Sequence, residues 1–178
     1  LVNAGNPTVV VRAADLGLLA TEVADRVNND RGLLDLLEGV RAAGAVAMGL
    51  AANQEEATRT VQAVPKIAWV APADDMLLAS GETVRAQDID LCARILSMGR
   101  LHHAFTGTGA IALAVAAQLP GSVVRSVLAT PPERLRIGHA SGRLEMAARV
   151  AQRHGQWVME RTGFSRSARR LMQGQIFV

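Results

Sequence analysis

The sequence has very little of several residue types, and each shortage excludes a class of protein. It has one cysteine, Cys92, and no tyrosine among 178 residues. A single cysteine excludes an internal disulfide framework and fits a reducing compartment, so we expect a cytoplasmic protein. The longest apolar run, residues 110–117, is far shorter than the roughly 20 residues of a membrane helix. We expect neither a membrane partner nor a secretory signal at the start of the chain.

Charge and aromatic content also argue against nucleic-acid binding. The chain carries 19 basic and 16 acidic residues, a net charge of +3, and Lys66 is its one lysine. The sequence pI near 10.3 therefore reflects a small excess of arginine, spread along the chain. Aromatic residues make up 3% of the sequence, too few for base-stacking platforms. A hydrophobic fraction of 49% instead supplies a packed core and excludes wholesale disorder.

Periodicity and turn residues predict an α+β fold. Leucines at helical spacing after the cap candidates Asn29 and Asp30 predict a helix that continues to about residue 50. Residues 88–95 predict a short second helix, and the polar stretch 53–63 is expected to be a loop or a helix end. Apolar or alternating runs predict strands at residues 7–12, 66–70, 135–138, 143–150, 156–160 and 173–178.

One further helix, over residues 107–119, is apolar on every face and is ended by Pro120 and Gly121. A helix of this kind has to be buried all round. We therefore predict a single domain, residues 1–178, in which mostly antiparallel strands wrap around a central hydrophobic helix.

The segment just before that helix, Thr106-Gly107-Thr108-Gly109, is the strongest chemical signal. A helix start presents unpaired backbone N–H groups and the positive end of the helix dipole, which together bind anions. No Gly-Lys-Ser/Thr follows, so a carboxylate fits better than a nucleotide triphosphate. An ordinary helix cap explains the same residues.

Other reactive side chains carry weaker signals. Adjacent histidines on an extended segment point to opposite sides, so His102 and His103 are not expected to share a metal ion. We expect one of them to line the anion site and the other to pack, and we expect no metal. Cys92 lies in apolar company, typical of a core residue, and Lys66 is expected at the surface.

Short motifs in a fixed order resemble the PrpF family, which includes methylaconitate isomerases, methylitaconate isomerases and oxalomesaconate tautomerases. The motifs cover nearly the whole chain, and they are Asn3-Ala4-Gly5-Asn6-Pro7-Thr8, Pro65-Lys66-Ile67-Ala68, Ser97-Met98-Gly99, His102-His103-Ala104, Gly107-Thr108, Gly138-His139-Ala140-Ser141-Gly142 and Ser165-Arg166-Ser167-Ala168-Arg169-Arg170-Leu171-Met172. The resemblance implies a fold like that of diaminopimelate epimerase, in which two related halves enclose the active site. This chain resembles the second, C-terminal half.

The resemblance also implies a reaction without a cofactor, an allylic proton shift in an unsaturated di- or tricarboxylic acid. The catalytic lysine and cysteine of the family belong to the first half, and Thr106 stands where the epimerases carry a thiol, so this chain alone is expected to be inactive. Its implied partners are the polycarboxylate substrate and the missing N-terminal half, and a homodimer is compatible with it. The implied substrate-binding residues are Asn6, His103, Thr106, Gly107 and Thr108, followed by Ser141 and Arg169.

Two alternatives to this function stay open at the level of sequence. One is a non-catalytic domain that binds small carboxylates. The other is half of an amino-acid epimerase or racemase, which the absence of a second thiol disfavours.

Overall fold

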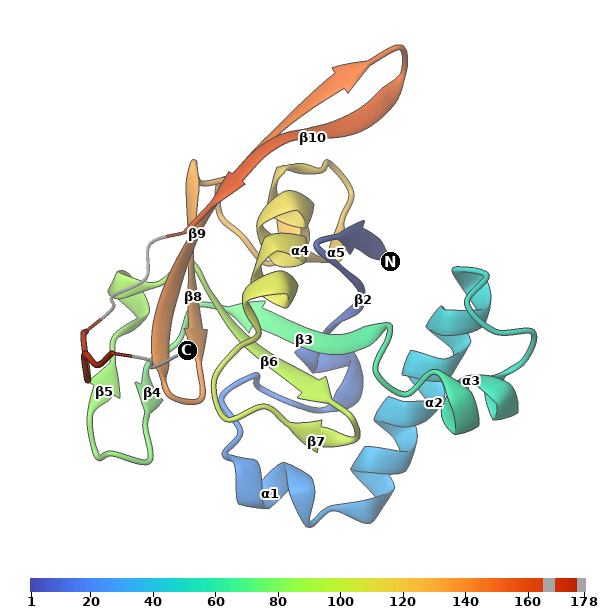
Figure 1. The fold of residues 1–178 in the computed structure, drawn as a ribbon, viewed down its shortest axis with the longest axis horizontal. Helices are drawn as coiled ribbons and strands as arrows, with labels where there is room; N and C mark the ends of the chain where they lie inside the picture. Colours follow the sequence, from blue (N-terminus) through green and yellow to red (C-terminus); the bar gives the residue numbers. More distant parts are fainter. Residues whose placement is uncertain (165–168, 176–178) are drawn as a thin grey trace.

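A computed structural model describes residues 1–164 and 169–175 and places most strands in one mixed sheet (Figure 1). The strand order is β1-β2-β3-β6-β8-β9-β10, with β7 paired to β6. The pairs β2–β3 and β6–β8 are parallel, and the other pairs of this sheet are antiparallel. The strands are Val2–Ala4 (β1), Asn6–Arg12 (β2), Lys66–Pro72 (β3), Leu91–Ser97 (β6), Arg100–Leu101 (β7), Arg134–His139 (β8), Gly142–Arg153 (β9) and Gln156–Gly163 (β10), with Met76–Leu77 (β4) and Thr83–Val84 (β5) forming a separate ribbon.

The described residues also form helices. They are Ala24–Asn28 (α1), Arg31–Ala47 (α2), Gln54–Thr60 (α3), Gly107–Gln118 (α4) and Val123–Ser126 (α5), and two short 3₁₀ turns cover Ala13–Leu16 and Ala86–Asp88. The start of α2 follows the sequence prediction, because the Asp30 side chain accepts a hydrogen bond from the Leu33 N–H at 2.9 Å.

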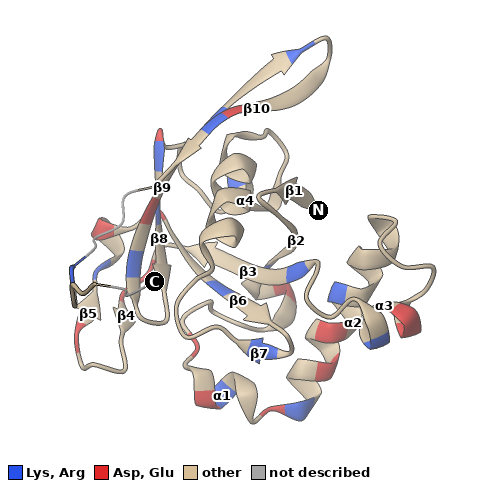
Figure 2. Ribbon diagram, in the orientation of Figure 1, with Lys and Arg blue, Asp and Glu red and all other residues tan. Residues whose placement is uncertain are grey.

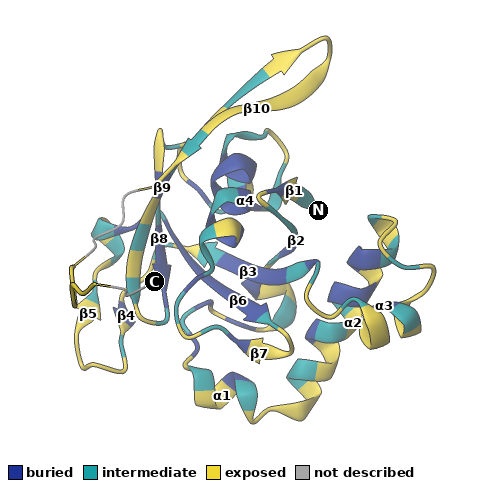
Figure 3. Ribbon diagram, viewed as in Figure 1, coloured by how far each residue is buried: buried dark blue, intermediate teal, exposed yellow. Residues whose placement is uncertain are grey.

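Helix α4 is the central element. Eight of its residues, from Gly109 to Ala117, are buried, and the helix packs against β9, β2, β1 and β8. Figure 2 shows no charged residue on α4. In Figure 3 much of the helix is dark blue, the colour of buried residues. The predicted α+β architecture, mostly antiparallel strands around a buried hydrophobic helix, is confirmed for the described residues.

Most of the predicted strands are also present. The predictions at residues 7–12, 66–70, 135–138, 143–150 and 156–160 correspond to β2, β3, β8, β9 and β10. The predicted closing strand is wrong for residues 173–175, which are irregular, and residues 176–178 lie outside the described part. Strands β9 and β10 together form a long hairpin that extends away from the rest of the molecule (Figure 1).

The short helix predicted at residues 88–95 is wrong, because most of this segment belongs to the central strand β6. Residues 91–96 are buried throughout, as expected of a strand covered on both faces, and such a run lacks the alternation that identifies a half-exposed strand. Asp90 caps no helix. Its carboxylate instead accepts hydrogen bonds from the backbone N–H of Arg136 at 2.7 Å and from its guanidinium at 2.6 Å.

The stretch 53–63, predicted as a loop or a helix end, contains the separate helix α3. The Asn53 side chain accepts a hydrogen bond from the Glu56 N–H at 2.9 Å and so begins the helix. Only Ala57 of α3 is buried, so the helix has a polar composition. For this reason the sequence of residues 53–63 resembles a loop.

Candidate functional site

The N-terminus of α4 presents backbone donors in the way the sequence predicted. The Thr106 hydroxyl accepts a hydrogen bond from the Gly109 N–H at 3.1 Å, and the Thr106 carbonyl accepts one from Ala110 at 2.9 Å. Thr106 is therefore a helix cap. Within the described residues, these bonds leave the N–H groups of Gly107 and Thr108 without an intrahelical acceptor, at the positive end of the helix dipole.

The turn between β1 and β2 lies against this helix start. Gly5 has a φ of +76°, and a Cβ added there would lie 3.3 Å from the Thr108 carbonyl oxygen. A side chain at this position would therefore crowd α4 as well as strain the backbone. The next residue, Asn6, has a buried Oδ1 without a hydrogen-bond partner among the described residues. Such an acceptor is unusual in a folded protein, and a ligand or water that donates a hydrogen bond would satisfy it.

The β8–β9 turn contacts the loop before α4 from another direction. The Ser141 hydroxyl donates a hydrogen bond to the backbone carbonyl of His103. The structure therefore brings Asn6, His103, Ser141 and the Thr106–Thr108 segment to one region of the fold.

The two histidines do not point to opposite sides, so that prediction is wrong. Their rings stack, with centroids 4.6 Å apart and planes at 21°. The backbone is not extended here, because the His102 Nδ1 accepts a hydrogen bond from the Ala104 N–H at 3.1 Å and turns the chain. His102 is half-buried and His103 is exposed. Burial, with a smaller effect from His103, lowers the pKa of His102.

His139 is a site residue that the sequence pattern did not single out, although it lies in one of the motifs. It is buried and lines a cavity of about 360 Å³ together with Phe105, Gly107 and Arg143. Burial, and next the charge of Arg94, lowers the pKa of His139 to about 4, so the ring is neutral at pH 7. Its Nδ1 accepts a hydrogen bond from the Ser141 N–H at 3.2 Å, which places the ring proton on Nε2, as a donor.

Arg169 makes no polar contact with the residues at the start of α4. It is exposed in the segment after β10 and makes no hydrogen bond or ion pair to another described residue. Residues 165–168 of the same motif lie outside the described part of the chain. Cys92 is buried, as predicted, and burial raises the pKa of its thiol.

Two other kinds of feature are absent from the described residues. No group of three or more His, Cys, Asp or Glu side chains is arranged to hold a metal ion in residues 1–164 and 169–175. No helix in those ranges is both long enough and apolar enough to cross a bilayer.

Comparison with known proteins gives consistent matches. The chain is 44% identical to 2-methyl-aconitate isomerase of Shewanella oneidensis, over all of this chain and 45% of that protein. It is 34% identical to 3-methylitaconate isomerase of Eubacterium barkeri, over all of this chain and 47% of that protein. The crystal structure of methylitaconate-delta-isomerase matches with a TM-score of 0.79 and 31% identity, over 90% of this chain and 44% of that one.

The chain thus spans about half the length of the relatives it matches. The family profile described as "PrpF protein" matches residues 1–178. From this match and the identities to its relatives, the chain belongs to the PrpF protein family.

Proposed function

We propose that the protein containing this chain is an isomerase that shifts a double bond in an unsaturated di- or tricarboxylic acid such as methylaconitate, methylitaconate or oxalomesaconate. The observation that supports this most is the pair of N–H groups of Gly107 and Thr108 at the positive end of α4. Such donors bind a carboxylate and stabilise the negative charge that develops on it during proton abstraction.

In the proposed reaction, a base removes a proton from the carbon next to the double bond. The electron pair delocalises through the double bond onto a carboxylate, and a proton returns two carbons away. Gly107 and Thr108 hold that carboxylate, and the neutral His139 lines the adjoining cavity. Donors fixed in place before the reaction stabilise the transition state more than the substrate.

We place the acid/base groups outside this chain's donor cluster. Thr106 is occupied as the cap of α4, and a hydroxyl is a poor proton carrier at neutral pH. With its proton on Nε2 and a pKa near 4, His139 is a donor and a weak base. The proposal therefore includes a second half with the catalytic lysine and cysteine, a fold like that of diaminopimelate epimerase, a reaction without a cofactor, and a cytoplasmic location.

Proton exchange in deuterated water tests this function. The complete protein that contains this chain should incorporate deuterium into methylaconitate or oxalomesaconate, whereas residues 1–178 alone should bind the acid without exchange. Losing one positioned acid/base group typically costs about 10²–10⁴-fold in rate. Exchange by residues 1–178 alone that disappears in His103→Ala would place the chemistry in this chain instead.

The non-catalytic alternative gives a different result. If the complete protein binds these acids in calorimetry but exchanges no proton with any of them, the domain is a carboxylate-binding module and the isomerase proposal is wrong.

A further inference from the structure

A second cavity, of about 290 Å³, lies between helix α2 and the start of strand β3. Its apolar lining includes Leu34 of α2, Pro65 and Ile67 at the start of β3, and Leu96 at the end of β6. It shares no lining residue with the cavity beside α4. A ligand in this cavity would therefore have its own contacts, apart from those proposed for the substrate.

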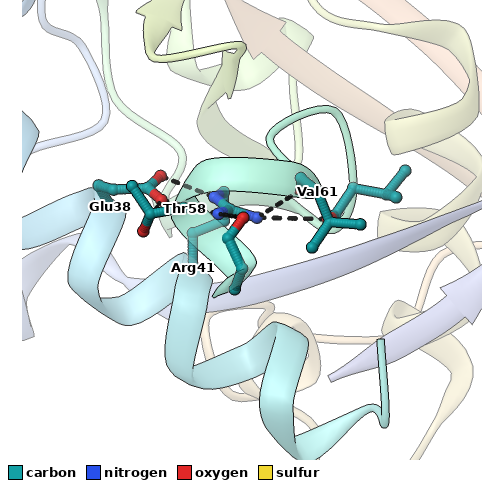
Figure 4. Close-up of polar contacts among 6 residues, drawn as sticks. Glu38, Arg41, Thr58 and Val61 are labelled. Carbon is teal, nitrogen blue, oxygen red and sulfur yellow. Dashed lines mark hydrogen bonds and ion pairs between the residues drawn. The ribbon is translucent and has the colours of Figure 1, made fainter. Parts of the chain in front are cut away.

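The polar wall of this cavity already has its hydrogen bonds (Figure 4). The Arg41 guanidinium donates to both carboxylate oxygens of Glu38 at 2.7 Å and to the carbonyl of Val61 at 3.0 Å. Glu38 also accepts from the Thr58 hydroxyl at 2.7 Å. Burial alone would raise the pKa of Glu38, but the hydrogen bonds from Arg41 and Thr58 hold it below its usual range. The polar atoms of Arg41 and Glu38 thus have hydrogen-bond partners within the protein and need no ligand.

Lys66 is different. It is half-buried and lines the same cavity, and its Nζ donates to the Ser97 hydroxyl at 2.8 Å. It forms no ion pair with any carboxylate in the described part of the chain. An ammonium group has three N–H donors, so two remain after the bond to Ser97. Burial lowers the pKa of Lys66, because its charge has lost water without gaining a counter-ion.

The remaining charges on the lining do not supply that counter-ion. Arg31 and Asp35 form an exposed pair at 3.7 Å, and Arg41 is matched by Glu38. Lys66 therefore leaves the lining with one positive charge in excess, next to apolar side chains. An anionic group attached to an apolar body matches both properties.

We propose that this cavity binds a small carboxylate with a short alkyl chain, which Lys66 and Ser97 hold by its carboxylate and the apolar lining holds by its chain. This cavity shares no lining residue with the cavity beside α4, although the charge of Lys66 reaches His102 and contributes to lowering its pKa. The proposal does not depend on the isomerase function. The carboxylate completes the hydrogen bonds of the Lys66 ammonium, and the alkyl chain covers Leu34, Ile67 and Leu96.

Nuclear magnetic resonance of residues 1–178 labelled with ¹³Cε-lysine tests the proposal directly, because Lys66 is the one lysine in these residues and gives one signal. Hexanoate should shift this signal to saturation and raise the Lys66 pKa, since a bound carboxylate favours the charged ammonium. Hexanol has the same alkyl chain without the charge and should not raise that pKa. No saturable shift with hexanoate would overturn the proposal.

Substitutions at Lys66 distinguish binding in this cavity from binding at the start of α4. Lys66→Met should weaken hexanoate binding in calorimetry at least about tenfold, whereas Lys66→Arg keeps a cation and should retain binding. Arg153→Gln, a charge removed from the distant hairpin, should bind as the wild type does. Wild-type affinity in Lys66→Met would contradict the proposal, and loss of affinity in Thr108→Ala instead would assign the carboxylate to α4.

Discussion

The hydroxyl of Ser141 donates a hydrogen bond to the backbone carbonyl of His103, and so joins residues 38 positions apart in the chain. Ser141 lies in the turn between β8 and β9, and His103 lies in the loop that leads into α4. The bond fixes this loop against the sheet. This loop leads directly to the donors at the start of α4.

Ser141→Ala should lower the free energy of unfolding by about 1 kcal/mol, since one intramolecular hydrogen bond is lost. It should also weaken the binding of a tricarboxylate such as tricarballylate, because the loop before α4 is less fixed. Urea unfolding and calorimetry measure the two effects. Thr130→Ala removes an exposed hydroxyl that makes no hydrogen bond within the described residues, and as the control it should change neither. Equal behaviour of the two variants would show that the Ser141 bond contributes nothing.

Thr106→Ala should destabilise the protein by about 1 kcal/mol, because α4 loses the side chain that caps its Gly109 N–H. Thr106→Ser keeps the hydroxyl and should restore most of the loss. Thermal unfolding measures both. Asn53→Ala removes the cap of α3 and should reduce stability without affecting tricarballylate binding. An unchanged unfolding temperature in Thr106→Ala would show that its hydroxyl contributes nothing as the cap of α4.

Thr108→Ala should leave stability unchanged and weaken tricarballylate binding by about 1 kcal/mol, the contribution of one hydroxyl bond. Thr108 is exposed, and its hydroxyl makes no hydrogen bond within the described residues, so its loss removes no internal contact. Calorimetry measures the affinity, with Thr83→Ala in β5 as an exposed control. An unchanged affinity would mean that the Thr108 hydroxyl makes no hydrogen bond to the ligand.

His139 should make the protein less stable in mild acid. Its pKa is about 4 in the folded protein against 6.5 for an unperturbed histidine, so the unfolded chain binds a proton more readily. The contribution of the neutral His139 ring to the free energy of unfolding is complete above about pH 6.5. This contribution falls as the pH decreases toward 4, by on the order of 2 kcal/mol at pH 5.

Urea unfolding of the wild type and of His139→Asn at pH 5 and pH 7 measures this dependence. Asparagine keeps an acceptor for the Ser141 N–H and does not titrate, so the variant should show a smaller difference between the two pH values. The same difference in both proteins would assign the acid sensitivity to other groups.

The sequence predicted α4 well because its signal is local. An uncharged apolar run, a threonine cap and a Pro-Gly end define a buried helix without reference to the rest of the chain. Strands β2 and β3 were also predicted from local patterns in the sequence. Strand β6 was misread because its identity depends on its pairing with β3 and β8 in the sheet, while its buried apolar pattern fits a buried helix equally well.

For the candidate site, the resemblance named residues but not the contacts between them. The resemblance singled out Asn6, His103 and Ser141, yet only the fold shows that Ser141 contacts the loop of His103. His139 was missed because burial, which no local pattern encodes, determines its charge. The cavity at Lys66 was missed for the same reason, since α2 and β3 meet there only after folding.

Helix α4 has no polar side, so hydrophobic patterning cannot decide how it is rotated about its axis. Steric fit decides instead. At Gly109, for example, an added Cβ would lie 2.6 Å from the Cδ1 of Ile95. The N–H groups of Gly107 and Thr108 turn with the helix, so any rotation of α4 about its axis would redirect them. Selectivity among anionic ligands can therefore evolve through small residues of the core that no ligand touches.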